Sequence, residues 1–160
     1  MAIIDKKLEL SDAQATGALT YDTTEVVSDF VSDLGAPGST GWSLFTGSSA
    51  KTMDIGEGGV LELNVEVQVA LVGAASVLEV MLYTSASTAS LAVATATKLC
   101  SIFIPALSAA GYRASIKVPA GSVLRYLGLI YMSRTASLTS STINAWIGMD
   151  HRTASISAIA

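Results

Sequence analysis

The chain has 160 residues, a formal net charge of −4, a hydrophobic fraction of 51% and a charged fraction of only 14%. Ordinary soluble domains carry about 25% charged residues, so part of this surface is expected to be covered by something other than water. The pI near 4.8 and the lack of a basic cluster longer than Lys6-Lys7 argue against nucleic-acid binding, and no apolar run is long and unbroken enough to span a membrane.

Residues 1–20 contain too few apolar residues for a core segment and are predicted to form an N-terminal arm or a first edge strand, ahead of one β domain over 21–160. Asp5 and Glu9 interrupt the start before a signal-peptide core can form, which predicts a product made in the cytoplasm. We expect the apolar residues of the arm to contact a partner: Ile3, Ile4, Leu8 and Leu10.

A short strand is predicted around Val26 to Val31, followed by a glycine-rich loop over Leu34 to Ala50. The loop carries Trp42, which either closes one end of the core or belongs to a contact surface. Gly56 to Gly59 is interpreted as a hairpin turn, because a strand follows it, whereas a phosphate-binding loop would open a helix.

The strongest pattern in the chain is the period-2 alternation from Val60 to Val72, which predicts a long strand of an antiparallel sheet. The aliphatic parity is expected to face the core: Leu61, Leu63, Val65, Val67, Val69 and Leu71. The other parity is expected to face water, so substitutions there are expected to leave partner binding intact: Glu62, Asn64, Glu66 and Gln68.

Gly73 to Ala75 is predicted to turn the chain into a return strand over Ser76 to Thr84, forming a hairpin. The next passage, over 84–97, is rich in Ser, Thr and Ala and is compatible with a loop, a strand or a helix. Two further strands are predicted over Leu99 to Ile104 and Tyr112 to Val118. Cys100, the only cysteine, is expected to be a buried and inert thiol.

The segment from Val123 to Met132 is apolar on both parities, so it is either central to a packed sandwich or covered by a neighbouring subunit. Its Tyr126 and Tyr131 are candidates for partner contacts. A last strand over Thr142 to His151 completes about eight strands, which predicts an all-β, antiparallel, jelly-roll-like β-sandwich.

Catalytic and metal-binding constellations are missing from the sequence pattern. His151 is the only histidine, and Asp150 beside it is expected to point to the opposite face of a strand. Glu62 and Glu66 share a face but lie about 13 Å apart along a strand, too far for a carboxylate pair. We therefore expect a protein that is not an enzyme, with no cofactor and no metal site.

Charge is unevenly placed along the chain. Residues 1–66 hold eleven acids and three bases, a net charge of −8, whereas residues 67–160 hold two acids and six bases, a net charge of +4. Together with the low charged fraction, this asymmetry predicts a homo-oligomer or a larger assembly.

Four segments suggest a family: LELSDAQA (8–15), SDLGAPG (32–38), VPAGSVLRYLGLIYM (118–132) and INAWIGMD (143–150). They resemble the capsid cement, or decoration, proteins of short-tailed bacteriophages. The resemblance implies a jelly-roll homotrimer on the outer surface of the icosahedral capsid in the virion, where it bridges neighbouring subunits of the major capsid protein. The sequence departs from the family in the loop over 36–49 and in the passage after Tyr83.

The alternative function is a carbohydrate-binding jelly-roll module of a phage tail or of a secreted enzyme. Such a module needs exposed aromatic side chains on a sheet face, and Trp146, Tyr83 or Trp42 are the candidates for that role.

Overall fold

The computed structural model describes residues 9–34, 61–73, 75–119 and 123–149. In these ranges the chain is all-β apart from one 3₁₀ turn, η1 (Thr88–Ser90). The strands are β1 (Glu9–Ala15), β2 (Glu25–Val27), β3 (Ser32–Asp33), β4 (Leu61–Val72), β5 (Val77–Ser85), β6 (Thr97–Ile104), β7 (Arg113–Lys117), β8 (Tyr126–Arg134) and β9 (Ser140–Met149). The predicted all-β sandwich is confirmed.

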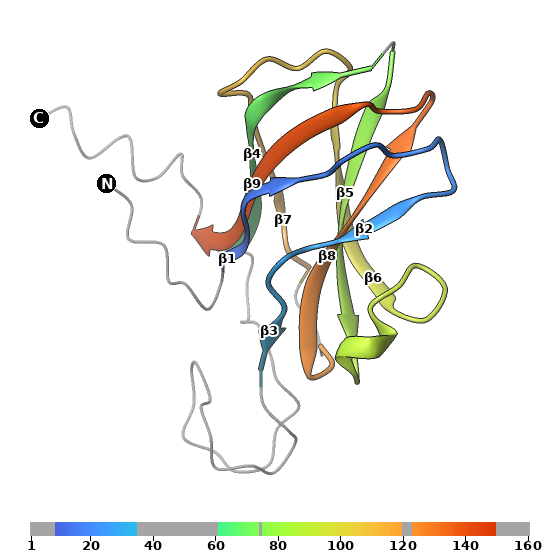
Figure 1. Ribbon diagram of the computed structural model, residues 1–160. Helices are drawn as coiled ribbons and strands as arrows, with labels where there is room; N and C mark the ends of the chain where they lie inside the picture. The colour runs from blue at the N-terminus through green and yellow to red at the C-terminus, as the bar shows by residue number, and fades with distance from the viewer. Residues whose placement is uncertain (1–8, 35–60, 74, 120–122, 150–160) are drawn as a thin grey trace, which may run out of the picture.

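The strands form two antiparallel sheets that pack face to face (Figure 1). One sheet has the order β1-β9-β4-β7, and the other has the order β2-β8-β5-β6, with β3 also paired to β8. The pairs are nested along the chain: β1 pairs with β9, β2 and β3 with β8, β4 with β7, and β5 with β6. This nesting is the topology of a jelly roll.

Because the strands are nested, four connections emerge at the same end of the sandwich, here called the four-loop end. It comprises the loops over 16–24, 105–112 and 135–139 and the β4–β5 connection. Backbone hydrogen bonds join these loops to one another and to β4. Leu19 N–H donates to the Leu138 carbonyl over 2.9 Å, and Leu71 N–H of β4 donates to the Ser108 carbonyl over 3.0 Å.

The hairpin predicted between β4 and β5 is wrong, because the two strands belong to different sheets. The connection is a corner that crosses from one sheet to the other. It depends on a close approach: a Cβ atom on Gly73 would lie 2.8 Å from the Ser137 carbonyl oxygen. A short glycine-containing link between two alternating strands looks the same in sequence whether the strands pair or part.

Strand β4 is confirmed, and Leu63, Val65, Val67 and Leu71 lie in the core. The polar row was only partly predicted, since Glu62 and Asn64 are buried while Glu66 is half-buried and Gln68 exposed. Strand β4 is central, and β7 and β9 flank it on both sides and shield its outer face. A register shift after Val67 also turns Val69 outward.

Strand β8 is buried on both faces within a single chain. Its inward residues Leu127 and Leu129 join the main core, while Ile130 and Met132 form a second cluster on the outer face. Leu91, from the passage over 84–97 that contains η1, packs into this second cluster. A neighbouring subunit is therefore not needed to explain the two-sided apolar strand, and the central position in a sandwich is the correct alternative.

A buried polar network joins the two sheets through Tyr131 of β8 and Ser11 of β1. The two hydroxyl oxygens lie 2.6 Å apart, and Ser11 Oγ lies 2.6 Å from Gln14 Oε1. Gln14 Nε2 in turn donates to the Val27 carbonyl over 2.8 Å. Burial raises the pKa of the Tyr131 phenol, so the hydroxyl remains protonated.

One expectation about this part of the chain is confirmed and two need correction. Residues 9–15 form the edge strand β1, which is one of the two alternatives for the start of the chain. Leu10 and Tyr131 are completely buried, so neither side chain contacts a partner. Both side chains belong to the main hydrophobic core. Leu10 reaches this core because β1 pairs with the last strand, β9.

We predict that Tyr131→Phe lowers the free energy of unfolding by about 1–2 kcal/mol, because the substitution keeps the ring but leaves Ser11 without one of its buried partners. Urea unfolding followed by fluorescence measures the change. Tyr112→Phe removes a hydroxyl from a partly exposed ring and is the matched control, with an expected change within about 0.5 kcal/mol. Equal effects of the two substitutions would contradict the role of the network.

Candidate functional site

The predicted partner-binding residues do not form one site. Leu10 and Tyr131 are in the core, and Tyr126 is half-buried on β8, where the Arg125 guanidinium lies 4.9 Å from the centre of its ring. The other four lie outside the described residues: Ile3, Ile4, Leu8 and Trp42. Asp150 and His151 also lie outside them.

The four-loop end instead carries a group of exposed apolar side chains. Leu107 is 70% exposed and Val69 is 53% exposed. Tyr112 lies at the end of the 105–112 loop. This loop runs beside β4, because Val67 N–H of β4 donates to the Tyr112 carbonyl over 2.9 Å. The members of this group are Tyr21, Leu107 and Tyr112 in the loops, and Val69 and Val72 in the part of β4 that leads into the β4–β5 connection. Several exposed apolar side chains toward one end of a domain make that end a candidate contact surface.

The same end of the sandwich is almost free of charge. No charged residue occurs in 67–78, 104–112 or 135–149, and the loop over 16–24 holds only Asp22. That aspartate pairs with Arg134. Uncharged surface costs little to remove from water, and the centres of protein interfaces are depleted of charge in the same way. Sequence analysis recorded the low charge but had no means of bringing these runs together.

An ion-pair network around the buried Glu79 links the β1–β2 loop to β5 and β8. Arg134 Nε donates to Glu79 Oε2 over 2.8 Å, and Arg134 also binds Asp22 in the β1–β2 loop. Lys98 Nζ lies 3.4 Å from the other Glu79 oxygen. Burial opposes ionisation of Glu79, but the hydrogen bonds from Arg134 and Ser101 and the charges of Lys98 and Arg134 outweigh it, so the pKa of Glu79 is lowered. The network holds the first loop against β5 and β8.

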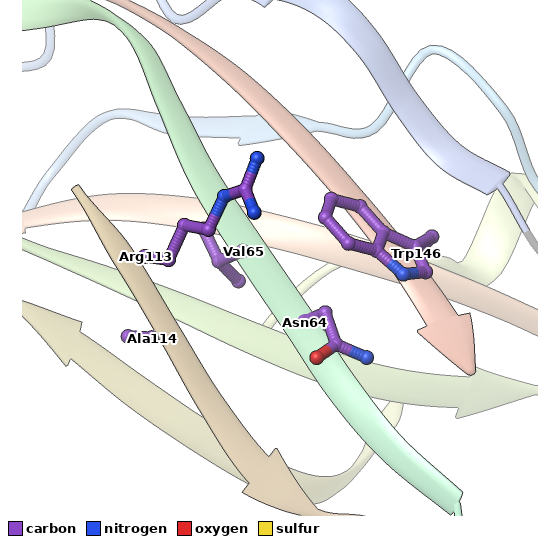
Figure 2. A pocket seen from close by; sticks show the side chains of 5 residues that line it. All are labelled: Asn64, Val65, Arg113, Ala114 and Trp146. Atoms are coloured by element: carbon purple, nitrogen blue, oxygen red, sulfur yellow. The ribbon is translucent and has the colours of Figure 1, made fainter. Parts of the chain in front are cut away.

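A second candidate site is a shallow pocket on the outer face of the four-stranded sheet. It is lined by Asn64, Val65, Arg113, Ala114 and Trp146 (Figure 2). Figure 2 shows the Arg113 side chain extending from β7 over β4 toward the Trp146 indole, with the Asn64 amide on the same side of β4 as the indole. The indole lies against β9, since a Cβ atom on Gly148 would be 3.2 Å from Trp146 Cδ1.

The polar groups beside this pocket are partly satisfied within the chain. Asn64 Nδ2 donates to the Glu62 carbonyl over 3.1 Å, and Arg113 pairs with Glu66 over 3.0 Å. One carboxylate oxygen of Glu62 is buried without a hydrogen-bond partner. An aromatic ring, an amide and a guanidinium group together can stack on a planar or sugar-like ring and bind its hydroxyl groups. Of the other two aromatic candidates, Tyr83 is buried and Trp42 is outside the described residues.

Reactive groups are few in the described part of the chain. Cys100 is half-buried, and burial raises the pKa of its thiol to about 11, so the thiolate is scarce at neutral pH. The described residues contain no group of three or more His, Cys, Asp or Glu side chains placed to hold a metal ion. Within the same ranges, no helix has the length and apolar character needed to cross a membrane.

Comparison with known proteins gives one family match. The sequence model of the Bbp16 family matches residues 10–147, which covers most of the chain and nearly all of its described strands. The name of this family suggests a bacteriophage protein. No curated protein matches the chain.

We predict that Glu79→Gln lowers the free energy of unfolding by about 1–3 kcal/mol at pH 7, because it weakens charge-assisted hydrogen bonds at a buried position. The folded state lowers the pKa of Glu79, so its contribution is complete above the unfolded value of about 4.3 and is lost as the pH falls through the lowered value. Urea unfolding at pH 7 and pH 3 measures the difference, which should shrink in acid.

Glu66→Gln is the matched control for this substitution. It removes the ion pair with Arg113, whose side chain is largely exposed, and is expected to cost at most about 1 kcal/mol at pH 7. A Glu79→Gln penalty that is no larger than this, or that persists unchanged at pH 3, would contradict the assigned role of the network.

Proposed function

Because the chain belongs to the Bbp16 family, we propose that it is a structural protein of a bacteriophage particle, and that it acts as a capsid cement protein. In this role it is made in the host cytoplasm and binds the outer surface of the capsid. Its partners there are subunits of the major capsid protein, and it stabilises the contacts between them. It does so by binding alone, without catalysis, a cofactor, a nucleic acid or a membrane.

The observation that supports this role most directly is the four-loop end. It combines exposed apolar side chains with an almost complete lack of charge, and hydrogen bonds between the loops hold it in shape. A preformed apolar surface loses little conformational entropy when it binds, so it suits attachment to a rigid shell. We assign the capsid contact to this end of the sandwich.

A cement protein acts by mass action. Binding to the assembled capsid but not to its separated subunits shifts the equilibrium toward the assembled state, as any ligand selective for one state does. Many copies bind each particle, and a copy with more than one attachment gains effective concentration for the second. Modest affinity at each four-loop end is then enough to stabilise the shell.

The proposal includes self-association, with the homotrimer as the expected state. The low charged fraction of the chain supports association with other protein surfaces. Strand β8 no longer supports it, because both of its faces are covered within one chain.

Electron microscopy of the phage particle that encodes this chain tests the proposal. We predict density for a β-sandwich on the outer surface of the capsid, with the four-loop end toward the major capsid protein. The double variant Val69→Asp/Leu107→Asp should bind capsids at least about tenfold more weakly, because it places charge in the apolar contact.

Leu124→Asp is the matched control for the double variant. Leu124 is 46% exposed but lies before β8, at the end opposite to the four-loop end, so its substitution should leave capsid binding unchanged. Particles that lack the chain would overturn the cement role. Capsid binding that is equally weakened by both changes would overturn the assignment of the contact.

A second candidate function is saccharide binding, supported by the pocket around Trp146, Asn64 and Arg113. A glycan array, followed by titration of any hit, tests it. We predict for this function that Trp146→Ala weakens binding at least about tenfold by removing the stacking surface, whereas Tyr21→Ala at the four-loop end does not. An array without hits would reject saccharide binding.

A further inference from the structure

The nested topology gives the sandwich two lateral edges. At one edge β1 lies beside the β2–β3 segment, since Asp29 N–H donates to Gln14 Oε1 over 3.0 Å and Phe30 N–H to the Leu10 carbonyl over 3.2 Å. At the other edge β7 contacts β6. Three strand spacings separate β1 from β7, about 14 Å, so the two edges face away from each other.

The first edge is acidic. Residues 9–34 contain six acids and no base: Glu9, Asp12, Asp22, Glu25, Asp29 and Asp33. Asp22 and Asp33 pair with arginines of the β8 region. Asp12 and Asp29 are exposed and make no ion pair with another described residue, so their charge is directed to the surroundings. We call this surface the acidic edge.

The opposite edge is basic. Residues 97–117 contain three bases and no acid: Lys98, Arg113 and Lys117. All three are exposed. Lys98 and Arg113 pair with glutamates of the central strands, but those carboxylates are largely buried, with side-chain exposures of 4% and 18%. The charge that a neighbouring molecule meets is therefore positive. We call this surface the basic edge.

Each edge also carries one exposed phenylalanine. Phe30 lies next to Asp29 on the acidic edge and is 47% exposed, and Phe103 lies on β6 at the basic edge and is 57% exposed. An exposed aromatic ring among charged groups has the composition of an interface, with an apolar anchor and a polar rim.

From these two surfaces we infer that copies of the chain associate side by side, the acidic edge of one copy against the basic edge of the next. A symmetric contact through either edge would set like charges against each other, whereas the head-to-tail contact pairs opposite charges. Such contacts between different surfaces close into rings when the rotation allows it. The inference deepens the self-association that the proposed function includes, by naming the two surfaces that meet. It rests on the charges of the isolated protein, so it can be tested separately from capsid binding.

Charge reversal tests the inference. We predict that the wild-type chain forms an oligomer at micromolar concentration and low salt, and that raising the salt concentration from about 50 to 500 mM weakens it, because exposed charges are screened. Asp12→Lys/Asp29→Lys, which reverses the acidic edge, and Arg113→Glu/Lys117→Glu, which reverses the basic edge, should each raise the dissociation constant at least about tenfold. Sedimentation equilibrium measures the masses.

Combining all four substitutions gives the decisive result. Each copy then carries a reversed but complementary pair of edges, so association should return to within about threefold of the wild type. Thr88→Lys/Ala89→Lys adds the same positive charge at exposed positions that belong to neither 9–34 nor 97–117, and it should leave the mass unchanged. If the basic-edge variant fails to fold, Arg113→Gln/Lys117→Gln replaces it and should still weaken association.

A wild-type monomer at all concentrations, an oligomer insensitive to salt, or a fourfold variant that stays dissociated would each overturn the inference. These measurements are made without capsids, so they are independent of the cement role. An oligomer that follows the predicted pattern but is missing from phage particles would leave the inference standing and remove the proposed function.

Discussion

The pairing of the first described strand with the last is the constraint on which the rest of this structure depends. Strand β1 lies against β9 at the edge of the four-stranded sheet, and Tyr131 of the other sheet reaches across the sandwich to Ser11 of β1. Inside this outer pair the other pairs are nested: β2 and β3 pair with β8, β4 pairs with β7, and β5 pairs with β6. The loops at the four-loop end and the two lateral edges are consequences of this closure.

The nested strand order also places the acidic part of the sequence and the basic part of the sequence on opposite lateral edges of the molecule. The acidic N-terminal part of the chain forms β1, β2 and β3 on one lateral edge, while the basic residues of 97–117 lie on β6 and β7 at the other. The uncharged runs meet at one end because alternate connections of a jelly roll emerge there. Three surfaces of different character, acidic, basic and apolar, therefore arise from one folding pattern.

Much of the sheet content was predictable, and the errors share a cause. Alternation identified the strand over Val60 to Val72 because one face of it packs on the core over several residues. The same alternation predicts that Glu62 and Asn64 face water, whereas both are buried. Alternation shows which face of the strand is apolar, but it does not show whether the flanking strands cover the polar face. The sequence pattern misplaces Leu10 and Tyr131 at a partner surface, because it does not reveal that both side chains lie in the core between the two sheets.

The sequence by itself determined the all-β class, most strand positions and the unequal distribution of charge, since these depend on local periodicity and composition. Tertiary structure alone decided that β4 and β5 part at Gly73, that β8 is covered on both faces within one chain, and that the uncharged loops converge. The physical reason is that local pattern fixes which way a side chain points along a strand. Which groups then meet is fixed by pairings between strands that lie far apart in the chain.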